Sequence, residues 1–224
     1  MRLDSHLVDV NIALLISLAK IFSLLISMNT VLVFCHPNHD SLSGALYQAA
    51  METIKQRGDA LRCFDLYAEQ FQAIMTVQER RAYLTDPQSI ISTVQAHVDA
   101  MRWAEHIVFV FPIWFYGPPA MLKGWLERVW LPGVAFLPPP KKGNAAIPGL
   151  QHIRRLTVIT HGGAPWWWLK LIGDPAKRLF TRGLRALMAK RCKTTWLQLH
   201  NMNNVSRCEC EAFICKVRKN LESF

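Results

Sequence analysis

The chain has 224 residues and a formal net charge of +10 at pH 7. Its 51% hydrophobic and 19% charged residues exclude a disordered chain, and its length suffices for one large domain or two small ones. The positive charge raises nucleic acid or an anionic membrane as partners, but the basic residues are spread along the chain without a recognisable nucleic-acid module. We therefore expect no nucleic-acid partner.

The six cysteines are scattered, and no two of them have the C-x-x-C spacing of a common metal or redox motif. Free thiols are typical of a reducing compartment, so we expect a cytoplasmic protein without a metal site. The cysteines are Cys35, Cys63, Cys192, Cys208, Cys210 and Cys215.

The first 28 residues form a separate segment. Residues 11–26 are largely apolar, but as a helix they span about 24 Å, which is less than a bilayer core of about 30 Å. Asp4 and Asp9, and the lack of a small-residue cleavage site, argue against a secretory signal peptide. We interpret residues 1–28 as an extension from an upstream start codon, with the domain starting at Met28. An interfacial anchor is the alternative, so membrane contact is expected only through residues 11–26.

From residue 30 onward, strand patterns alternate with helix patterns. Short apolar or β-branched runs predict strands, and the segments between them carry apolar residues at helical spacing. The run 106–111 has the continuous apolar character of a strand that is buried on both faces. The predicted strands are 30–35, 60–66, 106–111, 155–160 and 194–200; the predicted helices are 42–57, a short one with a capping box at Thr76–Glu79, 87–104, 119–130, one opened by Asp174 and Pro175 that reaches about residue 190, and 206–221.

Five strands separated by helices predict one parallel sheet covered on both faces. In such a sheet, ligands bind beyond the carboxyl ends of the strands, where the strand order reverses. The segments that follow strands one, three and four are residues 36–43, 112–119 and 161–168. We expect these three segments to converge on one site.

The first segment belongs to the run HPNHDSLSGAL, residues 36–46, which leads into a predicted helix N-terminus. Free amide groups and the helix dipole favour an anion at such a position. The side chains of His36, Ser41 and Ser43 add further donors. Plain N-capping by Asp40 or Ser41 is the alternative that requires no ligand.

The other two segments combine rings, prolines and glycines. In FPIWFYGPP, residues 111–119, prolines stiffen the chain and Gly117 permits a close approach or a positive φ. The aromatic side chains there either plug the end of the core or form a wall for a flat ligand. In THGGAPWWW, residues 160–168, the amides of Gly162 and Gly163 can donate to an electron-accepting ring and stabilise negative charge. The three tryptophans cannot all face a core, so at least one is expected in a lid or an interface.

Three stretches carry a specific resemblance: VFCHPNHDSLSGAL, F-P-x-x-F-Y-G-x-P-A-x-L-K-G-W-x-E-R-V and T-H-G-G. From about Met28 onward the chain resembles the flavodoxin-like NAD(P)H:quinone oxidoreductases, the DT-diaphorase group with its bacterial modulator-of-drug-activity and potassium-efflux-ancillary relatives. The resemblance implies an α/β flavodoxin-like three-layer sandwich in residues 29–224, with a five-stranded parallel sheet in the order 2-1-3-4-5. It also implies a homodimer and a flavin, with FAD favoured and FMN as the alternative.

The same resemblance implies a set of cofactor contacts. The family's tyrosine and histidine after the glycine pair are replaced here by Trp168 and Asp174, so no catalytic residue is assigned. By position, the phosphates and ribityl chain would contact His36, Ser41, Leu42 and Ser43; the isoalloxazine edge would contact Pro112, Ile113, Trp114, Phe115 and Tyr116; and the pyrimidine side would contact Thr160, His161, Gly162 and Gly163.

The implied activity is that of a flavin-dependent NAD(P)H oxidoreductase, in which a hydride passes from NAD(P)H to flavin N5 and two electrons go on to a quinone-like acceptor. The basic helix 177–193 is a candidate for attracting the dinucleotide phosphates. One alternative is a non-catalytic flavoprotein that regulates a membrane ion-transport partner, with residues 166–168 as an exposed patch. The other is a basic protein that binds membranes or nucleic acid on a vestigial flavin fold.

Overall fold

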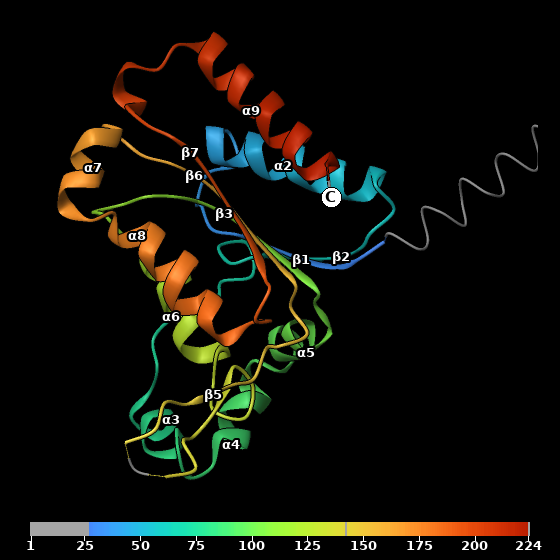
Figure 1. Ribbon diagram of the computed structural model, residues 1–224, viewed down its shortest axis with the longest axis vertical. Coiled ribbons are helices and arrows are strands. Elements are labelled where there is room, and N and C mark those ends of the chain that lie inside the picture. The colour runs from blue at the N-terminus through green and yellow to red at the C-terminus, as the bar shows by residue number, and fades with distance from the viewer. Residues whose placement is uncertain (1–26, 142, 224) are drawn as a thin grey trace, which may run out of the picture.

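The computed structural model describes residues 27–141 and 143–223. Its central sheet has five parallel strands in the order β2-β1-β3-β6-β7, which confirms the predicted flavodoxin-like order (Figure 1). Of the upstream extension predicted for residues 1–28, only residues 27 and 28 are described, and the interfacial anchor predicted for residues 11–26 lies outside the described residues. The strands are β1 (Asn29–Phe34), β2 (Ala60–Asp65), β3 (His106–Pro112), β6 (Arg155–His161) and β7 (Lys193–Leu199).

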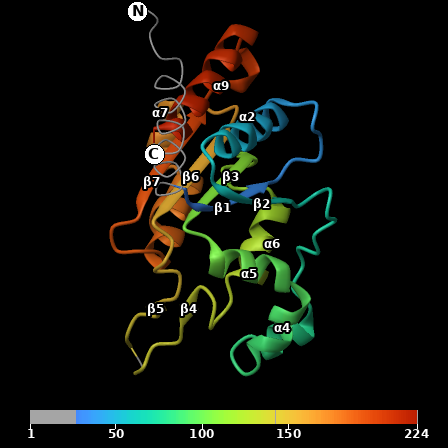
Figure 2. The ribbon, with the colours of Figure 1, turned by 90° about the vertical axis from the view of Figure 1, so that its right-hand side faces the viewer.

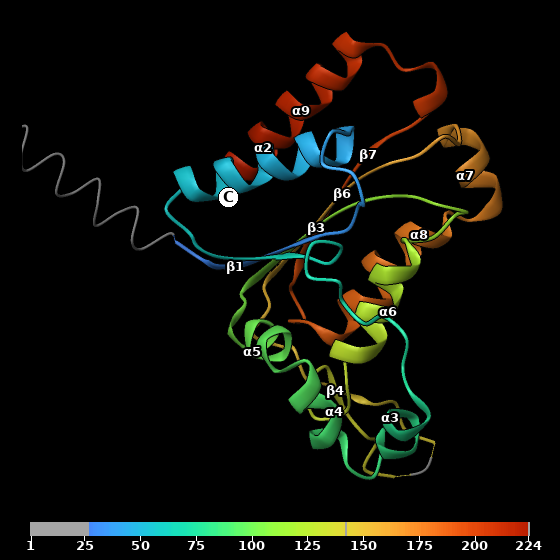
Figure 3. The same ribbon diagram turned by 180° about the vertical axis from the view of Figure 1, so that it is seen from behind.

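Helices cover both faces of this sheet, as predicted for a three-layer sandwich. One face lies under α2 (Leu42–Gln56) and α9 (Arg207–Glu222), and the opposite face lies under α5 (Gln95–Trp103), α6 (Ala120–Val129) and the helical run that begins with α8 (Pro175–Arg178), as Figures 1 and 3 show. All seven residues of β3 are buried, because apolar side chains from both layers pack on this central strand.

Side-chain caps fix where several helices begin. Ser41 is the N-cap of α2 and accepts a hydrogen bond from the Gly44 amide at 3.2 Å. The capping box predicted at Thr76 and Glu79 is present and begins α3 (Val77–Ala82). A second capping box, formed by Ser206 and Glu209, begins α9.

Several elements differ from the prediction. The helix predicted over 87–104 is two helices, α4 (Pro87–Thr93) and α5, because the backbone of the buried, β-branched Val94 leaves the helical region (φ −129°, ψ 27°). The helix opened by Asp174 and Pro175 is capped as predicted, but it continues as a π-helical and then a 3₁₀ turn and ends at Leu187. Not predicted at all were α7 (Trp166–Ile172), a 3₁₀ turn (Met202–Asn204) and a hairpin of β4 (Phe136–Leu137) and β5 (Ile147–Pro148).

A buried ion pair holds the segment between β2 and α4 against the domain. Arg128 of α6 donates to the carboxylate of Glu79 and to the carbonyl of Gln72, and it also bonds to the hydroxyl of Thr93 at 3.0 Å. In Figure 2 the helix α4 lies with the β4–β5 hairpin at the end of the molecule away from α9.

A second polar cluster joins the first strand to the last helix. The carboxylate of Asp59 accepts hydrogen bonds from the Met28 amide at 3.2 Å and from the Thr30 hydroxyl at 2.7 Å. It also pairs with Arg57, whose Nη1 donates to the Leu221 carbonyl at 2.6 Å. These groups lie at the amino ends of the strands, opposite the loops predicted to form the site.

All six cysteines are free thiols. Within residues 27–141 and 143–223, no helix has both the length and the hydropathy needed to cross a membrane.

Candidate functional site at the carboxyl ends of the strands

The three loops that the sequence singled out converge beyond the carboxyl ends of β1, β3 and β6. The hydroxyl of Ser43, in the first turn of α2, lies 2.7 Å from His161 Nε2, and the Ile113 amide donates to the His161 carbonyl at 2.8 Å. The rings of His36 and Trp114 lie with their centroids 5.8 Å apart. Segments separated by more than a hundred residues therefore share direct contacts, as predicted from the parallel sheet.

The first loop is tightly folded around the start of α2. Ser41 donates to the Asn38 carbonyl at 2.7 Å, while the same hydroxyl caps the Gly44 amide, so the capping that requires no ligand does occur. A Cβ at Gly44 would overlap the carbonyl of His39, and only glycine allows the loop to pass this close to the helix. Apart from that of Gly44, which Ser41 caps, the first amides of an α-helix lack partners within the helix and are available to an anion.

The second loop is a tight turn with unusual backbone angles. The amides and carbonyls of Trp114 and Gly117 exchange two hydrogen bonds of 3.0 Å, and the two residues between them, Phe115 and Tyr116, have φ of 46° and 65°. Of the two roles predicted for Gly117, a close approach or a positive φ, the positive φ is not found, because the turn places its two left-handed positions on the aromatic residues. Such angles strain side chains other than glycine, and Phe115 is 98% exposed, so its own packing does not offset the strain.

The third loop is shorter than predicted, because α7 begins at Trp166 directly after Pro165. Gly162 donates to the Leu199 carbonyl at 3.0 Å, and a Cβ on it would lie 3.3 Å from the Ile113 Cβ. Trp168 donates from its indole Nε1 to the Tyr116 hydroxyl at 3.1 Å, and this bond joins α7 to the second loop.

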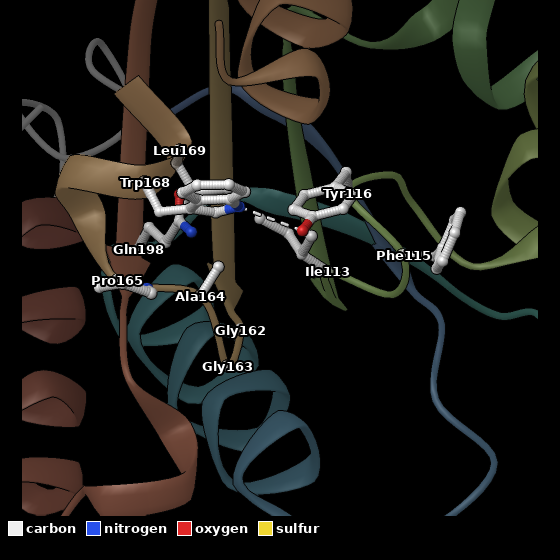
Figure 4. A pocket seen from close by; sticks show the side chains of 10 residues that line it. All are labelled: Ile113, Phe115, Tyr116, Gly162, Gly163, Ala164, Pro165, Trp168, Leu169 and Gln198. Atoms are coloured by element: carbon white, nitrogen blue, oxygen red, sulfur yellow. Dashed lines mark hydrogen bonds between the residues drawn. The ribbon is translucent and has the colours of Figure 1, made fainter. Parts of the chain in front are cut away.

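Between the second and third loops lies a cavity of about 450 Å³ (Figure 4). In Figure 4 the Trp168 indole and the Tyr116 ring meet across one side of it, whereas Phe115 points away. The ten residues that line it are Ile113, Phe115, Tyr116, Gly162, Gly163, Ala164, Pro165, Trp168, Leu169 and Gln198.

Gln198, in β7, is a lining residue that the sequence did not reveal. Its Oε1 accepts from the Trp196 indole at 2.9 Å, whereas its Nε2 is buried without a hydrogen-bond partner among the residues that the structure describes. A buried amide donor without a partner is costly unless a ligand or water satisfies it. Gln198 thus brings an unpartnered amide donor to the wall of the cavity, although the nitrogen itself is buried.

Comparison with known proteins decides the family. The sequence profile described as "flavodoxin-like fold" matches residues 28–216. The chain belongs to the flavodoxin-like family.

The relatives of this flavodoxin-like chain include NAD(P)H oxidoreductases and quinone reductases. It is 32% identical over 105 residues to the uncharacterized NAD(P)H oxidoreductase YcaK of Escherichia coli K12, a match that covers 47% of this chain and 54% of YcaK. It is 26% identical over 149 residues to human ribosyldihydronicotinamide dehydrogenase [quinone], covering 60% and 64% of the two chains. The chain thus spans about half to two thirds of the length of these curated relatives.

Solved structures agree with the fold. The FMN-dependent NADH-azoreductase of Bacillus anthracis, solved in complex with FMN, superposes with a TM-score of 0.70 at 15% identity, over 87% of this chain and 98% of the azoreductase. At this level of identity, the likeness concerns the flavodoxin-like fold alone.

The remaining predicted contact residues of the flavodoxin-like domain lie either at the ends of β3 and β6 or at the start of α2. Pro112 and Thr160 are buried at the ends of β3 and β6, and the Thr160 hydroxyl donates to the Phe111 carbonyl at 2.7 Å. Ser41 and Leu42 line a separate open groove of about 820 Å³ that runs from the start of α2 along α9. The structure therefore places Pro112, Thr160, Ser41 and Leu42 outside the lining of the 450 Å³ cavity.

His161 ends β6 and contacts Ser43 at the start of α2, and it is uncharged at neutral pH. Burial, and secondarily the nearby His36, lowers the pKa of His161 to about 4. Its imidazole therefore serves as a neutral hydrogen-bonding wall beside Ser43, and it brings no positive charge to the flavodoxin-like site near pH 7.

Proposed function

We propose that this protein is an enzyme, a flavin-dependent NAD(P)H oxidoreductase that reduces a quinone-like acceptor. The observation that carries the proposal is one cavity lined by a strained aromatic turn, a glycine pair and Gln198, whose buried amide nitrogen has no partner among the described residues. The N-terminus of α2 is joined to this end of the sheet by the contact between Ser43 and His161. The names of the flavodoxin-like relatives, which include NAD(P)H oxidoreductases and a quinone dehydrogenase, support the same activity.

The residues present fit a flat ring system. At Gly162 a side chain would press on Ile113, and the two residues form a narrow edge of the cavity. The Gln198 amide offers a donor to a ring nitrogen or carbonyl. We propose that residues 113–116 and 162–163 hold the ring, while His36 and Ser43, with the first turn of α2, hold the phosphates.

When bound, a flavin supplies hydride and two-electron chemistry that no side chain of the protein can provide. Trp168 donates to Tyr116, and their rings meet across one side of the cavity. Because the Tyr116 oxygen accepts this bond, its own O–H proton can be donated to a bound acceptor. An indole N–H only donates, so Trp168 cannot itself relay a proton.

We further propose FAD as the flavin, with FMN as the alternative. The 820 Å³ groove begins at Ser41, beside the proposed phosphate position, and continues along α9 past Arg207. This groove has room for the additional nucleotide of FAD. The azoreductase that shares the fold is solved with FMN, which keeps the smaller flavin as the competing outcome.

We also propose that the protein works as a homodimer in the cytoplasm. Large apolar side chains on the second loop and on α7 are exposed: Phe115 by 98%, Trp166 by 61%, Trp167 by 56% and Leu171 by 72%. Exposed apolar side chains gathered on one element, as on α7, are typical of interaction sites. The free thiols are compatible with a reducing compartment.

The decisive experiment is to purify the protein, release its flavin, identify the flavin by mass, and add NADH or NADPH anaerobically. We expect a yellow protein with one flavin per chain, bleaching by a reduced nicotinamide nucleotide, and return of colour when a quinone is added. A colourless protein that takes up no flavin contradicts the proposal. A bound flavin that neither nucleotide bleaches would favour a non-catalytic regulator that docks through Trp166–Trp168.

A further inference from the structure

A second cavity, of about 460 Å³, lies on the other side of α7 from the proposed flavin site. Trp168 and Leu169 of α7 line the first cavity, and Trp166 and Lys170 of the same helix line the second. The nine residues that line the second cavity are Trp166, Lys170, Gly173, Asp174, Lys177, Arg178, Thr181, Arg182 and His200.

The second cavity is strongly basic. Its four cations are Lys170, Lys177, Arg178 and Arg182, and among the described residues none of them forms an ion pair with a carboxylate. Asp174 is the one carboxylate in the lining, so the lining carries a formal charge of +3. Cations held together in a concave surface without partners raise the local concentration of anions and bind them.

The cavity also has features that position a ligand. The Asp174 side chain accepts from the Lys177 amide, which caps α8, and the guanidinium of Arg178 lies against Gly173, where a Cβ would be 3.1 Å from its Nη1. Trp166 offers an exposed indole face beside these charges. An aromatic face next to guanidinium groups matches a nucleobase that carries phosphates.

Resting on the proposed function, we infer that this second cavity binds the phosphorylated adenosine half of NADPH, and that the enzyme prefers NADPH to NADH. The charge decides the preference. Both dinucleotides carry a pyrophosphate with two negative charges. The formal charge of +3 exceeds these two charges, so positive charge remains to pair with the 2′-phosphate that only NADPH carries. Arginine is the usual partner of that group.

The two cavities share one short helix, α7, as part of their walls. α7 has seven residues and is about 10 Å long. A dinucleotide that places its nicotinamide in the first cavity can extend past α7 and place its adenosine phosphate in the second. The short α7–α8 connection through Gly173 and Asp174 keeps the two cavities side by side, as the adjacent positions of these helices in Figures 1 and 3 show.

The test compares adenosine 2′,5′-bisphosphate with AMP, because only the former carries a 2′-phosphate. Calorimetric titrations of the flavin-loaded protein should show at least about tenfold tighter binding of the bisphosphate. In the variant Lys177→Gln/Arg182→Gln the bisphosphate should bind about tenfold more weakly. The matched control is Lys190→Gln/Arg191→Gln, which removes the same charge from exposed residues outside the cavity lining and should stay within about twofold of wild type.

Steady-state kinetics provide a second readout. In the cavity variant the KM for NADPH should rise about tenfold with kcat unchanged, and the KM for NADH should change less than about threefold. Equal binding of bisphosphate and AMP, or a cavity variant that behaves like the control, would overturn the inference even if the enzyme is fully active. If instead the protein retains no flavin, the proposed function fails, and the calorimetric comparison on the flavin-free chain still decides whether the cavity recognises the 2′-phosphate.

Discussion

The hydroxyl of Ser43 lies 2.7 Å from Nε2 of His161, although 118 residues separate the two in the chain. Ser43 is buried in the first turn of α2, and His161 ends β6. Their hydrogen bond joins the proposed phosphate position to the proposed ring position.

Replacement of Ser43 by alanine should therefore lower the free energy of unfolding by about 1–2 kcal/mol, because the imidazole loses a buried partner. Urea denaturation measures this loss, and a double-mutant cycle with His161→Gln should give a coupling above about 0.5 kcal/mol. The control is Ser92→Ala at an exposed serine of α4, which should cost less than about 0.5 kcal/mol. A Ser43→Ala variant as stable as this control would mean that the contact contributes nothing.

The stability of the flavin-free protein should fall as the pH drops from about 6.5 to 4. Burial lowers the pKa of His161 from 6.5 to about 4, so over this range the unfolded chain binds a proton that the folded chain does not. The contribution of His161 is complete above the unfolded pKa and amounts to at most about 3 kcal/mol. Urea titrations across this pH range should show a shallower decline for His161→Gln; parallel curves for the two proteins are incompatible with the assignment.

Gly162→Val should abolish flavin retention. A Cβ at this position already lies 3.3 Å from the Ile113 Cβ, and the two methyl groups of valine must enter the cavity or displace the second loop. Flavin content after gel filtration measures the effect. Gly183→Val serves as the control, since a Cβ there meets only Leu179 at 3.8 Å. Retention at the wild-type level in Gly162→Val would show that the flavin does not bind against this edge.

Trp168→Phe should weaken flavin binding several-fold, because it removes the indole N–H that holds the Tyr116 hydroxyl. The neighbouring Trp167 is exposed and does not line the cavity, so Trp167→Phe is a closely matched control. Fluorescence titration of the flavin-free proteins gives both dissociation constants. The prediction is wrong if the two substitutions have the same effect.

Arg128→Met should destabilise the domain by about 3–5 kcal/mol, since it leaves the carboxylate of Glu79 buried and without its charged partner. On the same helix, Lys123 pairs with Glu127 at the surface, and Lys123→Met should cost less than about 1 kcal/mol. Thermal or urea unfolding of the two variants distinguishes a buried from an exposed ion pair. Equal losses would mean that burial does not set the cost here.

The sequence predicted the parts of this molecule that depend on hydrophobic pattern. Continuous apolar runs such as 106–111 indicated buried parallel strands, and their order placed the three loops together. Patterns that depend on local backbone geometry were harder to interpret. The non-helical backbone at Val94 and the positive φ of Phe115 and Tyr116 are imposed by tertiary packing and by the hydrogen bonds of the turn, which leave no mark in residue type.

Two features of the site were missed for related reasons. The helix α7 starts with three tryptophans and follows a proline that gives no side-chain cap, so nothing in its composition indicated a helix start. Gln198 was interpreted as an ordinary strand residue, because a lone glutamine in a strand carries no motif. Only the structure shows that Trp196 donates to its Oε1 and that its buried Nε2 is left without a partner among the described residues.

The link between Arg57, Asp59 and Leu221 has a practical consequence for handling the protein. Because this cluster lies at the amino ends of the strands, the last turn of α9 points away from the cavity mouth. An electrode or resin coupled near residue 223 would hold each molecule with the proposed flavin site turned toward the solution. Electron exchange in such a device would then depend on diffusing mediators and not on direct contact with the support.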